Sequence, residues 1–257
     1  MEVGRAVARR LGCPCVDREI IVEAARRYEV AAERLADVDE HAPSFWGRFD
    51  RERRRHLVFI RAALLDRLAG GVCVVTGRLA PFLVRDLTPV LRVGITAPLE
   101  LRVRRAMAER RVDEATARAE LAAAERELAA QARVLFDLDS SDPLHYDLVL
   151  NTARLGVEEC AAVVVRAAEV WESHDALVVL RDRALAAAVH AALARERALG
   201  ALDLEVTAAE GRVMLGGAVI GAPYAERARA VAASVPGVRE VVCESAAPVP
   251  IPPVERF

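Results

Sequence analysis

The sequence predicts a mixed α/β fold, with a parallel sheet flanked by helices, followed by a smaller α+β unit of element order αββαβ. Three short apolar runs, Gly71–Gly77, Val90–Thr96 and Tyr146–Thr152, are typical of buried parallel strands. Helical periodicity fills the segments between them, and strands that alternate with helices favour a parallel, helix-covered sheet. The pattern changes after Trp171, where a long helix precedes two alternating strands.

The first unit is expected to open with an amphipathic helix, in which Arg5, Arg9 and Arg10 alternate with apolar residues. Residues 39–56 are polar and interrupted by Pro43, so they predict an exposed connection. Further helices are expected at Arg55–Leu68, Leu99–Arg110, Asp113–Leu135 and Val157–Glu172.

The second unit is expected to begin with a helix at Ala176–Leu199. Two alternating strands joined by a tight Glu210–Gly211 turn should follow, then a helix at Pro223–Ser234 and a last strand in "GVREVVCES". The predicted domains are residues 1–172 and 173–246, and residues 247–257 form an extended proline-rich tail.

Composition excludes several classes of protein. The 257 residues are 54% hydrophobic, which excludes a disordered chain, and a net charge of −2 gives no general attraction to nucleic acid or anionic membrane. All 36 basic residues are arginine, so a Schiff-base lysine and a phosphate-binding lysine are both excluded. Five scattered cysteines form no metal-ligand pattern, and no apolar run reaches the ~20 residues of a membrane span. We therefore expect no metal site and a cytoplasmic location.

Arginines follow the predicted strands at the points where they end. Arg78 comes directly after Gly77, and Arg102 and Arg105 lie at the start of the helix after the next strand. Open α/β sheets bind ligands at this edge, and converging guanidinium groups suit phosphate. For arginines 110, 111 and 118 we favour ordinary solvated or ion-paired positions.

Four segments resemble the cytidylate kinase-like proteins, which are relatives of the nucleoside monophosphate kinases with a P-loop fold. In chain order they are "GRAVARRLGCPCVDREII", "VVTGRLA", "RVGITAPLELRVRR" and "DPLHYDLVLNT", and the resemblance covers Met1 to Arg166. It implies that Asp17, Arg18 and Arg78 bind the acceptor nucleotide. It also implies catalytic, charge-stabilising roles for Arg102, Arg105 and Arg126.

The sequence departs from the family pattern in its first residues and in the lid. Family members open with a strand and a glycine-rich phosphate loop, and Met1 stands where the basic residue of that loop would be. We therefore expect a degenerate or N-terminally truncated kinase-like domain that lacks the first strand. The strand around Val72–Val75 would then lack a neighbour on one side, unless the remaining strands pair with one another across the gap. An unpaired strand edge of this kind could pair with a second copy of the chain in a homodimer. In the lid, Glu125 replaces an aspartate and Gln131 an aromatic residue.

The second unit resembles a BON domain over Asp175–Glu244, on the segments "DALVVLRDRALAAAVHAAL", "LEVTAAEGRVMLGGAV" and "AERARAVAASVPGVREVV". The resemblance implies a binding module for a protein or small ligand that the sequence does not identify.

Two functions remain open. The first is a kinase-like protein that keeps a nucleotide or anion pocket for a CMP-like ligand and acts as a regulatory or interaction protein. The second is an active cytidylate kinase that transfers phosphoryl from ATP to CMP with Mg²⁺, if residues upstream supply the phosphate loop. The first function requires no cofactor.

Overall fold

A computed structural model describes residues 2–17, 19–30, 47–171, 176–196, 198–200, 204–217 and 222–243 of the chain. The chain divides into two compact units, Met1–Leu180 and Arg181–Phe257. The α/β class predicted from the sequence is confirmed in the first unit, and the αββαβ order in the second.

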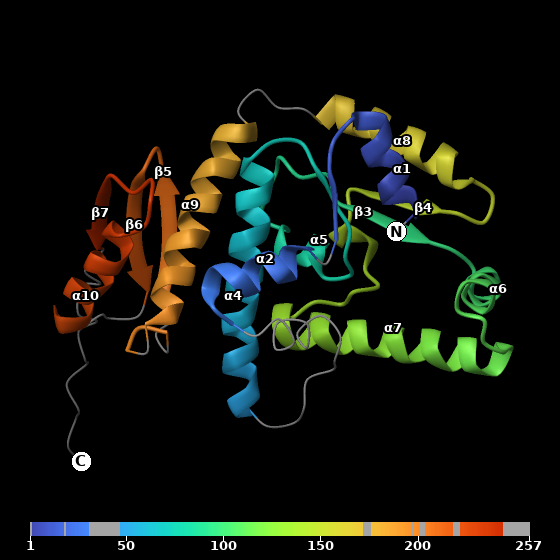
Figure 1. The fold of residues 1–257 in the computed structure, drawn as a ribbon, viewed down its shortest axis with the longest axis horizontal. Helices are drawn as coiled ribbons and strands as arrows, with labels where there is room; N and C mark the ends of the chain where they lie inside the picture. The colour runs from blue at the N-terminus through green and yellow to red at the C-terminus, as the bar shows by residue number, and fades with distance from the viewer. Residues whose placement is uncertain are drawn as a thin grey trace, which may run out of the picture. The chain divides into compact units, whose positions relative to one another are not determined.

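The strands of the first unit form two separate parallel pairs, of which Figure 1 labels the second, β3 and β4. β1 (Cys15–Val16) pairs with β2 (Val74–Val75), and β3 (Val93–Thr96) pairs with β4 (Leu148–Asn151). The parallel direction agrees with the prediction, but each strand is shorter than its apolar run. Within the described part of the chain no hydrogen-bonded ladder joins β2 to β3, so the four strands do not form one continuous sheet.

Helices surround these pairs and make up most of the first unit. They are α1 (Glu2–Leu11), α2 (Glu19–Tyr28), α4 (Gly47–Ala69), α5 (Ala80–Leu83), α6 (Leu99–Arg110), α7 (Glu114–Phe136) and α8 (Val157–Trp171). α7 begins where sequence rules predict, because the carboxylate of Asp113 accepts a hydrogen bond of 2.7 Å from the backbone N–H of Thr116.

The core of the strand region lies beneath α1. Val3 and Val7 pack with Leu150 of β4 and Val164 of α8, and Figure 1 shows α1 beside α8. α1 also approaches β2 closely at Gly4, where a Cβ atom would stand 2.5 Å from Cγ2 of Thr76. A helix can lie this close to a strand only where the side chain is missing.

The predicted exposed connection at residues 39–56 is wrong in its second half. Residues 47–56 belong to α4, and His56 near the middle of that helix is only 6% exposed. Arginine and glutamate are good helix formers, so a charged segment can extend a helix whose next turns are apolar. Residues 39–46 lie outside the described residues.

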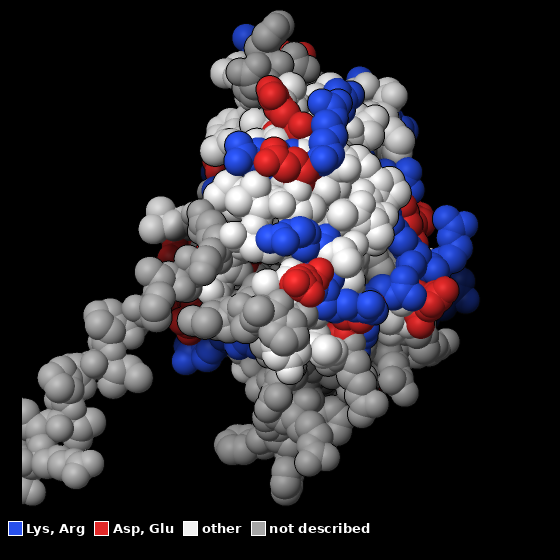
Figure 2. Space-filling model, turned by 90° about the vertical axis from the view of Figure 1, so that its left-hand side faces the viewer, with Lys and Arg blue, Asp and Glu red and all other residues white. Residues whose placement is uncertain are grey.

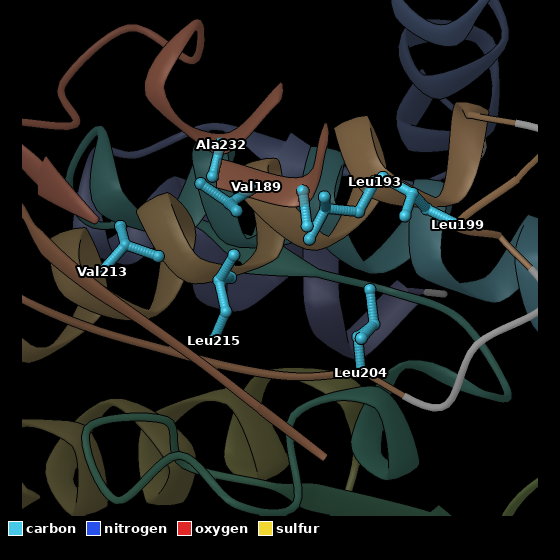
Figure 3. Packing of buried hydrophobic residues seen from close by; sticks show 8 residues of the cluster. Val189, Leu193, Leu199, Leu204, Val213, Leu215 and Ala232 are labelled. Atoms are coloured by element: carbon cyan, nitrogen blue, oxygen red, sulfur yellow. The ribbon is translucent and has the colours of Figure 1, made fainter. Parts of the chain in front are cut away.

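The helix α9 (Ala176–Arg195) begins in the first unit and continues into the second. The second unit also contains β5 (Leu204–Ala209), β6 (Arg212–Gly217), α10 (Ala222–Ala233) and β7 (Glu240–Cys243). β6 lies between β5, its antiparallel partner, and β7, its parallel partner. The predicted Glu210–Gly211 turn is present, and both residues have positive φ angles, of 50° and 86°. Figure 3 shows the core, in which Val189 and Leu193 of α9 face Val213 and Leu215 of β6.

None of the helices in the described ranges combines the length and the apolar character that crossing a bilayer requires.

Candidate functional site

The ends of β1 and β2 carry two of the residues predicted to bind ligand. Asp17 follows Val16 directly, and Arg78 follows Val75 by three residues, after Thr76 and Gly77. Because β1 and β2 are parallel, their carboxyl ends meet at one edge, where open α/β sheets bind ligands. Arg18 lies outside the described residues.

A pocket opens at this edge, with a volume of about 680 Å³, which is within the usual range for small-ligand sites. Its lining residues are Arg5, Cys15, Asp17, Glu19, Val22, Glu23, Arg26, Arg67 and Thr76. Asp17 is thus a pocket residue, whereas Arg78 is not among the lining residues in the described part of the chain. The ligand-binding roles of both residues stay predictions.

Three of the charged side chains of the pocket form hydrogen bonds or ion pairs with other groups of the protein. The carboxylate of Glu19 accepts a hydrogen bond of 2.7 Å from the backbone N–H of Asp17, which lowers the pKa of Glu19. Arg67 donates to Glu23 at 3.2 Å. Within the described ranges, no hydrogen bond or ion pair is recorded for the side chains of Arg5, Arg26 and Asp17, so these groups can face a ligand.

Cys15 adds little reactivity to the pocket. Burial raises the pKa of its thiol, and only part of that rise is offset by the positive charge of Arg5. A protonated thiol is a poor nucleophile and a poor metal ligand. Across the described residues, no three histidine, cysteine or acidic side chains gather in a way that could hold a metal ion.

A second, much smaller cavity adjoins the pocket and shares Asp17 and Thr76 with it. Its volume is about 60 Å³, and its other walls are mainly apolar side chains such as Leu64 and Leu83. At roughly 30 Å³ for each water, this space holds about two waters and no nucleobase.

Arg78 and Arg102 point instead to one turn of α7. Arg78 donates from Nη1 to the carbonyl oxygen of Ala124 at 3.4 Å, and Arg102 forms an ion pair with Glu125, the next residue. Arg102 also donates to the carbonyl oxygen of Ala97 at 3.0 Å. The structure therefore brings these two predicted residues together against the helix predicted to be a lid.

The other two predicted catalytic arginines, Arg105 and Arg126, do not take part in these contacts with Ala124 and Glu125. Arg105 donates to the hydroxyl of Thr152 at 3.1 Å and to its carbonyl oxygen at 3.4 Å, just beyond the end of β4. Arg126 is exposed on α7 beside Glu125.

Three arginines of the pocket were not predicted from the sequence as site residues: Arg5, Arg26 and Arg67. A signal was present in α2, where Glu19, Glu23 and Arg26 recur every three or four residues and therefore share one helix face. Arg5 and Arg67 come from helices distant in sequence, and only the folded arrangement shows that they meet this face.

These features define an α/β protein with a charged pocket at the carboxyl end of its parallel strands, joined to an αββαβ unit. Residues 1–154 match the model of the cytidylate kinase-like family, and the chain belongs to that family. Residues 181–244 match the BON domain, so the chain carries a BON domain after its kinase-like part.

Among solved structures, the chain is similar to the crystal structure of an uncharacterized protein from Eubacterium ventriosum, with 18% sequence identity and a TM-score of 0.49. The match covers 65% of this chain and 90% of that one. No curated protein matches the chain.

Proposed function

We propose that the kinase-like unit binds a nucleoside monophosphate such as CMP in the pocket at the ends of β1 and β2, and that the protein acts in regulation or interaction. The observation that carries this proposal is the pocket itself. Its volume of about 680 Å³ suits a nucleotide, and Asp17, Arg5 and Arg26 have no recorded partner among the described residues.

The contacts of the predicted catalytic arginines support binding without phosphoryl transfer. Arg102 is paired with Glu125, and Arg105 is bonded to Thr152. A guanidinium group held by an internal carboxylate is less available to stabilise charge that develops on a transferring phosphoryl group.

Isothermal titration of the full chain with CMP tests the proposal, with Asp17→Ala as the first variant, because Asp17 lines the pocket. Loss of its hydrogen bond to the ligand should weaken CMP binding about tenfold. Arg78→Ala tests the acceptor-binding role that the family resemblance implies for Arg78, and unchanged CMP binding in that variant would remove Arg78 from the binding site. Arg85→Ala is its matched control, because Arg85 also donates to a carbonyl of α7, that of Phe136, at 3.0 Å. Absence of CMP binding by the unaltered chain would overturn the proposal.

The BON domain is proposed as the interaction module, for a protein or a small ligand. On the face drawn in Figure 2, arginine and acidic side chains lie next to one another across a largely uncharged surface. Such a mixed surface favours a specific partner over general attraction to an anionic membrane. We also propose a cytoplasmic location, which the five free cysteines support.

An active nucleoside monophosphate kinase is the second candidate. The exposed position of Arg126 on α7 favours it, because a lid that carries this arginine could bring a positive charge to the phosphates. The described residues offer no metal cluster, so Mg²⁺ would have to enter with the phosphates of ATP.

Production of ADP from ATP and CMP by the full chain decides between the two candidates. Turnover on the order of 10 s⁻¹, typical of enzymes, would establish the kinase. That activity should then fall in Arg126→Ala. Turnover at background level, together with CMP binding, supports the regulatory function.

A further inference from the structure

We infer that the phosphate of the ligand is held by Arg5 and Arg26, and that Asp17 accepts a hydrogen bond from a hydroxyl or amino group of the same ligand. This inference rests on the proposed function, because it concerns the same pocket, and it assigns the anion to residues that neither the family match nor the sequence pattern singles out.

The internal contacts of the pocket select these residues. Of its three arginines, Arg67 is held by Glu23 at 3.2 Å, whereas Arg5 of α1 and Arg26 of α2 have no recorded hydrogen bond or ion pair within the described ranges. Arg78 does not line the pocket, and it donates to Ala124. Two guanidinium groups from different helices can both donate to one phosphate.

The pocket contains equal numbers of positive and negative side chains, and this indicates which class of ligand it can bind. Its six charged side chains are three arginines and three carboxylates, so their formal charges cancel. A bare polyanion would meet Asp17 and Glu19 as well as the arginines and would gain little. A ligand without an anionic group would leave Arg5 and Arg26 unused. A phosphate monoester of a sugar or nucleoside, which has an anionic end and hydroxyl or amino donors, satisfies both sets.

The dimensions place the whole ligand in this one pocket. The adjoining cavity of about 60 Å³ is too small for a base, whereas 680 Å³ accommodates a nucleoside monophosphate. Val22, which is 61% exposed, lines the pocket and offers an apolar surface against which a base can lie.

The test compares three ligands, CMP, cytidine and ribose 5-phosphate, by titration of the full chain and its variants. Arg5→Gln and Arg26→Gln should each weaken CMP and ribose 5-phosphate about tenfold or more and leave cytidine unchanged, because cytidine has no phosphate. Asp17→Asn should weaken cytidine as well as CMP. All three side chains are at least partly exposed, and circular dichroism checks that each variant is folded.

Matched controls lie on the same helices. Arg9→Gln removes an arginine of α1 that pairs with Glu158, and Arg27→Gln removes one of α2 that pairs with Asp66. Neither arginine lines the pocket, so both controls should bind all three ligands normally.

The outcomes separate this inference from the proposed function. If CMP binds but neither Arg5→Gln nor Arg26→Gln weakens it, the assignment of the phosphate is overturned and nucleotide binding stands. If CMP does not bind but ribose 5-phosphate binds and requires Arg5 and Arg26, the assignment stands and nucleotide binding is overturned. If none of the three ligands binds, both are overturned.

Discussion

At the scale of single residues, a largely buried charge pair joins the beginnings of β3 and β4. Asp147 accepts hydrogen bonds from the backbone N–H of Arg92 at 2.7 Å and from its guanidinium at 2.7 and 3.1 Å. The two side chains are 20% and 14% exposed for Arg92 and Asp147, so this pair is screened less than the surface pairs elsewhere.

Asp147→Asn should lower the free energy of unfolding of the first unit by about 1–3 kcal/mol at pH 7. The hydrogen bonds from Arg92 lower the pKa of Asp147 below its unfolded value. The stabilisation is therefore fully present above about pH 4 and is lost as the pH falls through the lowered pKa. Urea denaturation of both proteins at pH 7 and pH 3 measures the difference, which should shrink at pH 3.

Glu120→Gln, in a surface pair with Arg110, is the control and should change stability by less than about 1 kcal/mol. A difference between Asp147→Asn and the unaltered chain that stays constant from pH 7 to pH 3 would contradict the assigned role of the carboxylate.

The family resemblance implies that Asp17 binds the acceptor nucleotide. Asp17 lies at the end of β1 and lines the pocket, and its role in binding stays a prediction. The contact of Arg78 with α7 could not be predicted, because the direction of a long side chain depends on which helix packs over the strand end. Its role in binding stays a prediction.

At the scale of elements, the close packing of α1 on the end of β2 requires a residue without a side chain at Gly4. Gly4→Ala should destabilise the first unit by about 1–3 kcal/mol, because the new Cβ would stand 2.5 Å from Cγ2 of Thr76. Thr76→Ser removes that methyl group and keeps the hydroxyl, so the double variant should recover most of the loss. Chemical denaturation of the four proteins forms a double-mutant cycle, and strictly additive effects would contradict the contact.

The β5–β6 hairpin gives a second element-scale prediction. Its two turn residues have positive φ angles, which glycine and asparagine adopt at a lower cost in free energy than glutamate. Glu210→Asn should therefore stabilise the second unit by about 0.5–1 kcal/mol. Gly211→Ala should destabilise it, because a Cβ there would lie 3.1 Å from the carbonyl oxygen of Gly237.

Hydrogen exchange of the β5 and β6 amides measures both changes. Faster exchange in Gly211→Ala and slower exchange in Glu210→Asn are expected. The reverse order would show that the strain lies elsewhere in the hairpin.

Helices were predicted more accurately than strands. α6 has the predicted limits, since Pro98 precedes it and Arg111, with a φ of 58°, ends it. The apolar run at Gly71–Gly77 predicted a buried strand, yet β2 contains only Val74–Val75. The prediction of burial is also wrong, since Val74 and Val75 are only partly buried and Ile95 of β3 is 47% exposed. Both the length of a strand and its burial depend on neighbours that an apolar run does not specify. The pocket is harder to predict than any single element, because its walls combine residues of three helices, α1, α2 and α4, whose packing no local pattern specifies.

At the scale of the whole molecule, the two compact units should respond separately to a nucleotide. CMP at about 100 times its dissociation constant should stabilise the first unit by about 2.7 kcal/mol. Differential scanning calorimetry with and without CMP should therefore show one transition shifted and the other unchanged.

Leu215→Ala identifies the second transition, because Leu215 is fully buried in the core of the second unit and its truncation costs about 2–5 kcal/mol. A CMP-induced shift in the transition that Leu215→Ala lowers would contradict the assignment of the pocket to the kinase-like unit.

The packing of α1 on α8 has a consequence for synthesis on the ribosome. Arg9 of α1 meets Glu158 of α8 across 149 residues of chain, and the core beneath α1 needs Val164 as well. At roughly 5–20 residues per second, α1 emerges on the order of ten seconds before the partner that covers it. During that interval the nascent chain exposes the apolar face of α1, which makes this short segment a natural place for a chaperone to bind.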